Sequence, residues 1–122
     1  MTILIQCFIQ KTRSHSSYNT LWDSGRGLPK HLYSNLSNVE GDSTWLTAFA
    51  SNGLTYGTND YSDSVNLVVW NWKANGGTAT ATISESGNNP AASVQANPTA
   101  GFSLITYIGT GGAGTIAHGL GA

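Results

Sequence analysis

Three histidines and one cysteine lead the short set of side chains in this chain that could do chemistry. The histidines are His15, His31 and His118, and no Gly-x-Ser-x-Gly motif accompanies any serine, so a serine nucleophile is not indicated. A zinc site needs several His or Cys residues at close spacing, which the sequence lacks. We therefore expect each histidine to be exposed or packed rather than catalytic.

The acidic and glycine-rich stretches bear a partial likeness to three further kinds of site. Asn59-Asp60-Tyr61-Ser62-Asp63 places oxygen ligands at alternating positions, as calcium loops do, but it lacks the glycine and distal glutamate of an EF-hand. Glu40 and Asp42 could pair as acid and base in a glycosidase, although nothing else marks them. Residues 109–114 lack the lysine and following helix of a phosphate-binding loop. We predict polar loops at these places, and no catalytic, metal or cofactor site.

Aromatic side chains offer a different chemistry, the stacking of flat rings on sugars. Trp70 and Trp72 share one face of an expected strand over 65–74, with Val68 beside them. A Trp-x-Trp pair of this kind is either core packing or a sugar platform, and we predict core for Trp70 while Trp72 stays open. Three aromatic residues are the candidate contacts for a glycan or a partner: Trp45, Tyr61 and Trp72.

The composition predicts an ordered domain with few charges. The chain has 122 residues, a formal net charge of −1 and only 9% charged residues, against about 25% in an ordinary soluble domain. Its five Lys and Arg residues are too few and scattered to bind a nucleic-acid backbone. Ser, Thr, Asn and Gly supply the polarity, while four Trp, five Tyr and three Phe help to drive folding. Such surfaces suit extracellular or virion proteins.

Cys7 is the only cysteine, so the fold does not depend on an intrachain disulfide. Because Cys7 stands beside Phe8, we predict that it is a small buried hydrophobic residue. The apolar stretch 1–9 is short, lacks a basic region before it and contains Gln6. It is neither a transmembrane span nor a convincing signal peptide, so no membrane insertion is expected.

Short strands separated by turn residues predict an all-β fold. No long window keeps the apolar spacing of a helix, and Asn52-Gly53 is a strong hairpin signal. We predict one domain over residues 1–122, an antiparallel β-sandwich or jelly roll in which 76–98 is a mobile or edge-hairpin segment. The expected strands are 3–10, 20–23, 31–35, 46–50, 54–56, 65–74, 79–85, 91–96 and 101–108.

Several motifs, taken in order, resemble a module of structural and tail-fibre-like proteins from marine bacteriophages, including cyanophages. The resemblance is carried by Gly101-Phe-Ser-Leu-Ile-Thr-Tyr107, a glycine-rich turn and Thr115-Ile-Ala-His-Gly-Leu-Gly121. It is also carried by Phe8-Ile-Gln-Lys-Thr-Arg-Ser14, Leu21-Trp-Asp-Ser-Gly-Arg-Gly27, Leu46-Thr-Ala-Phe-Ala-Ser-Asn-Gly53 and Val69-Trp-Asn-Trp-Lys-Ala-Asn-Gly-Gly77. These motifs cover most of the chain from Phe8 onward.

The resemblance implies a concanavalin-A-like or laminin-G-like β-sandwich with no catalytic residues to carry over. It also implies a non-enzymatic virion protein, a component of a tail fibre, an appendage or the capsid surface. Its expected partners are other virion proteins, further copies of itself and a host surface. The alternative is a carbohydrate-binding, lectin-like module in which Trp45, Tyr61 and Trp72 stack on host glycans.

The order of the motifs departs from the family at the two ends of the chain. In the family, the His-Gly-Leu-Gly segment runs through a proline-containing link into an Ile-Val-Lys-x-Arg strand. Here His118-Gly-Leu-Gly121 stands at the C-terminus and the matching strand at the N-terminus, as in one repeat cut at a different point. We expect that the termini lie close together, or that the tail of each chain completes a neighbour's sheet.

Overall fold

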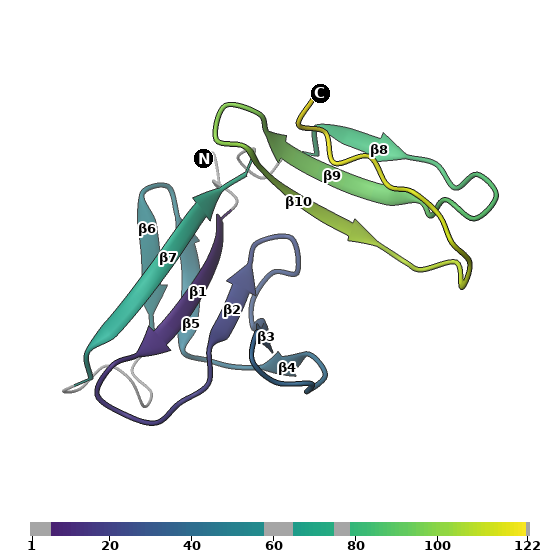
Figure 1. The fold of residues 1–122 in the computed structure, drawn as a ribbon. Helices are drawn as coiled ribbons and strands as arrows, with labels where there is room; N and C mark the ends of the chain where they lie inside the picture. The colour runs from purple at the N-terminus through teal and green to yellow at the C-terminus, as the bar shows by residue number, and fades with distance from the viewer. Residues whose placement is uncertain (1–5, 58–64, 75–78, 122) are drawn as a thin grey trace.

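Ten strands in three antiparallel sheets make up the computed structural model, which describes residues 6–57, 65–74 and 79–121 (Figure 1). None of these residues forms a helix that could cross a membrane. The strands are β1 (Gln6–Thr12), β2 (Thr20–Asp23), β3 (Lys30–Tyr33), β4 (Gly41–Asp42), β5 (Leu46–Ala50), β6 (Gly53–Tyr56), β7 (Leu67–Lys73), β8 (Ala81–Ile83), β9 (Ala92–Asn97) and β10 (Phe102–Tyr107).

The largest sheet has five strands in the order β4-β3-β2-β1-β7. A two-stranded hairpin, β5–β6, and a three-stranded sheet in the order β10-β9-β8 complete the fold. The all-β prediction, with antiparallel sheets, is confirmed, and the jelly-roll alternative stays a prediction. The sequence missed β4 because its two residues, Gly41 and Asp42, have low strand propensity.

The main core forms between the five-stranded sheet and the β5–β6 hairpin. Phe8 on β1 and Trp22 on β2 are cross-strand partners, and their rings stack with centroids 5.0 Å apart. Leu46 on β5 closes the cluster from the other layer, and all three side chains are buried. Figure 1 shows the hairpin lying behind β1 and β7. We call this side of the five-stranded sheet the core face.

Trp70 lies on the opposite, outer face of the sheet, so the prediction that it belongs to the core is wrong. Gln10 pairs with Val69 and Ile9 pairs with Trp70 along the β1–β7 ladder. Since neighbouring residues of a strand point to opposite faces, the core position of Phe8 sends Val69 inward and Trp70 outward. Val69 accordingly packs against the core, whereas Trp70 is 49% exposed.

The three-stranded sheet buries one face of β9 beneath the C-terminal tail. Ala92, Val94 and Ala96 alternate with less buried residues, and all three are covered. Gly119 has a positive φ of 71° and lies so close that a Cβ there would be 3.0 Å from Val94 and 3.1 Å from Ala96. The glycine-rich tail is therefore a closely packed cover over β9.

The placement of the tail bears on the expected junction between the two ends of the chain. β1 is bordered by β2 on one side and β7 on the other, so it offers no free edge to the tail. The tail instead packs on β9, through Gly119. Within the described residues, His118-Gly-Leu-Gly121 does not join the sheet of β1. Residues 1–5 and 122 lie outside the described part of the chain.

A cavity at Leu46 is expected to destabilise the domain strongly. Leu46 is 2% exposed, so Leu46→Ala removes buried contacts and lowers the free energy of unfolding by about 2–5 kcal/mol. Leu36, which is 37% exposed, is the matched control, and Leu36→Ala should change stability by less than about 0.5 kcal/mol. Urea unfolding followed by circular dichroism measures both. Equal losses in the two variants would contradict this core.

The Cys7 thiol is expected to be inert in the folded protein. The prediction that it is buried is confirmed, and this burial, assisted by the nearby charge of Asp23, raises its pKa from 9.0 to about 11. At about pH 8 the folded chain should react with a thiol reagent at least about 100-fold more slowly than the chain in guanidinium. Similar rates in both states would show that Cys7 is accessible.

Candidate binding surfaces

An aromatic cluster extends the core to the surface beside β3. Trp22 contacts both His31 and Trp45, with ring centroids 6.1 and 6.4 Å away. Tyr33 follows on the same face of β3, with its ring 4.9 Å from that of His31. Tyr18 then meets Tyr33 edge to face at 5.1 Å. Each ring contacts the next, so the cluster runs without interruption from the buried Trp22 to the exposed Tyr18.

Two hollows open on this cluster, and both are lined by Tyr33 and Trp45. We call them the aromatic hollows. Their volumes are about 300 and 440 Å³, within the range of small-molecule pockets. The smaller is also lined by Pro29, His31, Asp42, Ser43 and Thr44, and the larger by Ser16, Ser17, Tyr18 and Asn35.

The carboxylates near the aromatic hollows serve ion pairs. The Asp42 carboxylate lies 2.6 Å from the Lys30 ammonium, and the Glu40 carboxylate lies 3.9 Å from the Arg26 guanidinium. Each of these two acids therefore lies beside a different cation. In the described part of the chain, no group of three His, Cys, Asp or Glu side chains could hold a metal ion.

The sequence predicts that His31 is either exposed or packed, and the structure shows that it is packed. Its side chain is 5% exposed, and Nδ1 has no hydrogen-bond partner among the described residues. Burial lowers the pKa of His31 below its ordinary value, since the charged ring loses water, while Asp42 and Glu40 act in the opposite direction. His31 therefore favours the neutral form in the fold.

The structure separates the candidate aromatic residues from one another. Trp45 is half-buried and borders both aromatic hollows. Trp72 pairs with Cys7 on the outer face, where it is 38% exposed and stacks on Phe102 of β10 at 6.1 Å. Trp45 and Trp72 thus lie on opposite sides of the five-stranded sheet. Tyr61 falls outside the described residues.

The outer face of the five-stranded sheet carries a hydrophobic row. Trp70, Ile9, Leu21 and Leu32 are successive register partners across β7, β1, β2 and β3. Trp70 is exposed and the other three are half-buried. This row is an apolar stripe on the surface of the sheet, of the kind that a binding partner can cover.

β10 is an edge strand of the three-stranded sheet, and its outer backbone groups pair with none of the described strands. The carbonyl of Val94 accepts a hydrogen bond from the Thr80 amide, so Val94 directs its backbone groups toward β8. Its register partner, Ile105, consequently forms a non-hydrogen-bonded pair with it. The N–H and C=O groups of Ser103, Ile105 and Tyr107 therefore point away from β9, to an edge where the described chain places no strand.

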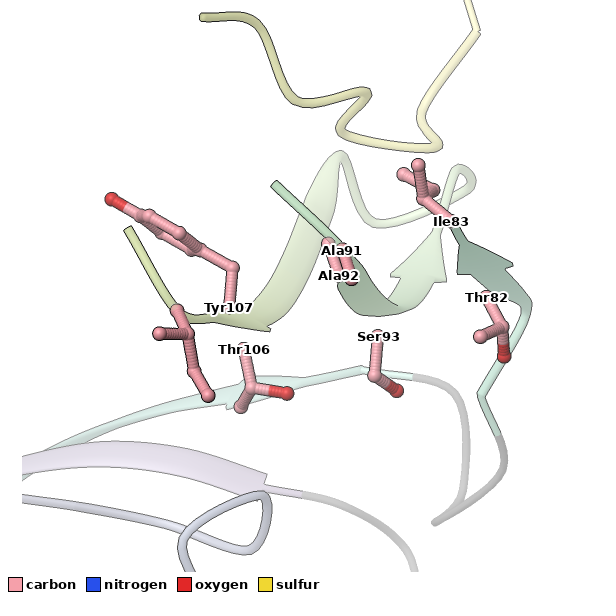
Figure 2. A pocket seen from close by; sticks show the side chains of 8 residues that line it. Thr82, Ile83, Ala91, Ala92, Ser93, Thr106 and Tyr107 are labelled. Carbon is pink, nitrogen blue, oxygen red and sulfur yellow. The ribbon is translucent and has the colours of Figure 1, made fainter. Parts of the chain in front are cut away.

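A shallow depression of about 360 Å³ lies at the end of β10 and is mostly apolar (Figure 2). Tyr107 and Ile83 project from one side of the sheet, whereas Ser93 and Thr106 project from the other. Tyr107 and the following Ile108 are both exposed. The free edge of β10 therefore continues into an exposed apolar end.

A family model described as a domain of unknown function (DUF7483) matches residues 6–122. The chain belongs to the DUF7483 family. The match runs from β1 through the tail that covers β9. Searches of curated proteins and of solved structures gave no match. The DUF7483 description assigns no activity.

Among the residues that line the aromatic hollows, only Trp45 is predicted from the sequence as a glycan or partner contact, while His31 and Asp42 are considered there for other chemistry. Trp45 was a candidate contact, whereas Tyr18 and Tyr33 were not singled out. The two-residue spacing of His31 and Tyr33 was available as a signal, since it puts both on one face of a strand. The contact of Tyr18 with Tyr33 depends on a turn between β1 and β2 that no sequence pattern specified.

Acid is expected to destabilise the DUF7483 fold through His31. Since its folded pKa lies below its ordinary value near 6.5, the unfolded chain takes up this proton more readily. The contribution is complete above pH 6.5 and is lost as pH falls below it. Urea unfolding between about pH 8 and about pH 5 should show a smaller loss for His31→Gln than for the wild type. Identical pH profiles would rule out this role.

Proposed function

We propose that this domain is a non-enzymatic structural module of a bacteriophage virion, placed in a tail fibre, an appendage or the capsid surface. It would act through assembly with copies of itself and with other virion proteins, and through attachment to a host surface. The motifs that resemble modules of marine phage proteins support the virion setting. The observation that carries the assembly role is the free outer edge of β10.

β10 lacks the features that usually protect an edge strand from pairing. Natural edges carry charges, prolines or bulges, or they are very short. β10 has six residues, Phe102–Tyr107, with no charged residue and no proline, and its register with β9 is unbroken. The other edge of the same sheet, β8, has only three residues. β10 is thus the better suited of the two edges of this sheet for pairing with another chain.

A second copy of the domain fits this edge by symmetry. Two β10 strands that pair antiparallel about a two-fold axis would satisfy the outward N–H and C=O groups of both strands. The same arrangement would cover part of Tyr107 and Ile108, which are exposed in the single chain. Strand pairing would then join two three-stranded sheets into one of six strands.

Proline at position 103 is expected to weaken self-association. Ser103 directs its N–H outward, so Ser103→Pro removes an edge donor while the pairing of β10 with β9 is kept. Loss of this hydrogen bond from both copies should raise the dimer dissociation constant about tenfold. Analytical ultracentrifugation over a concentration series measures this, with Ser103→Ala as the control.

A second variant tests association through β10 if the proline variant does not fold. Tyr107→Lys places a charge at the exposed end of the strand, where pairing with a second strand would have to cover it, so the variant should associate more weakly. A wild-type protein that stays monomeric at every concentration would overturn self-assembly through β10.

The virion setting is tested by mass spectrometry of purified particles of a phage that encodes the chain. Absence of the chain from the particles would overturn the virion setting.

A further inference from the structure

We infer that the aromatic hollows form a binding site for a neutral saccharide. The site lies beside β3 on the core face of the five-stranded sheet, whereas the three-stranded sheet contacts the outer face through Trp72 and Phe102. Binding there is separate from assembly through β10. Because the two hollows share Tyr33 and Trp45, two linked sugar rings, one in each hollow, would contact the same two side chains.

The rings of the site are already ordered for stacking. Tyr33 is held between His31 and Tyr18, with interplanar angles of 73° and 62°. Trp45 lies nearly parallel to His31, at an interplanar angle of 27°. The C–H groups on the face of a sugar ring match the negative face of an aromatic ring, and a fixed ring costs little entropy on binding.

Polar groups around the rings can serve sugar hydroxyls. The Asn35 side-chain oxygen accepts the Asn19 amide at 2.8 Å, which orients the Asn35 NH2 group as a donor. The Ser43 hydroxyl accepts the Trp45 amide at 3.2 Å and keeps its own proton to donate.

The charge of the site favours a neutral ligand over an anion. The residues that line the aromatic hollows include no Lys or Arg. The only acidic residue that lines them, Asp42, is paired with Lys30 at 2.6 Å. A phosphate or carboxylate group would therefore find no free cation there, whereas a neutral sugar needs none.

The test is an NMR titration of the full chain with sugars of known structure. The probes are glucose, galactose and N-acetylglucosamine, followed by the disaccharides cellobiose, lactose and chitobiose. We expect a saturable shift of the Trp45 indole N–H resonance, with tighter binding for a disaccharide. Tyr18→Ala should weaken binding about two- to tenfold, because it removes one aromatic contact from the rim.

Tyr107→Ala is the matched control for Tyr18→Ala. The two tyrosines are 58% and 52% exposed, but only Tyr18 lines an aromatic hollow. Tyr107→Ala should leave sugar affinity within about twofold, and Ser103→Pro should do the same, so a failure of assembly is distinguishable. No shift with any of the sugars, equal losses in both tyrosine variants, or shifts only with inorganic phosphate or peptides would overturn the proposal.

Discussion

The stacked pair of Phe8 and Trp22 is the contact on which the rest of this domain depends. The two residues are register partners on β1 and β2, and both side chains are almost completely buried. A one-residue slip between these strands would turn either ring to the outer face and break the stack. The pair therefore sets the register of β1 with β2. Leu46 of the β5–β6 hairpin packs against the two stacked rings.

The same pair decides what each face of the five-stranded sheet can do. On the core face, the Trp22 ring contacts the rings of His31 and Trp45. The core is therefore continuous with the aromatic hollows that these two residues line. On the outer face, Ile9 and Trp70 are left at the surface because they follow the opposite phase of the pleat. The candidate sugar site and the exposed hydrophobic row are thus two consequences of one register.

Glycine and asparagine carry the architecture of the C-terminal third, where charges are scarce. A Cβ at Gly114 would overlap the Asn88 carbonyl, and the Thr115 amide donates to the Asn89 side chain at 2.8 Å. These contacts hold the tail over β9, and none of the described strands pairs with the outer edge of β10. The motif from Leu21 to Gly27 is structural too, because the Asp23 carboxylate accepts the Arg26 amide at 2.8 Å and pairs with its guanidinium.

Local pattern alone was enough to predict nine of the ten described strands and the all-β fold class. Alternating apolar residues and turn signals located nine of the strands, and the hairpin turn at Asn52-Gly53 joins β5 to β6 as expected. The low charge and the burial of the single cysteine were also predictable from the sequence. Only the tertiary structure decided which face of β7 is inside, since Leu67-Val68-Val69-Trp70 is apolar on both faces and the choice is made by Phe8 on a neighbouring strand. It also decided that Trp45 meets Tyr33 and Tyr18 while Trp72 meets Phe102, because such contacts depend on how separate sheets pack and not on spacing along one chain.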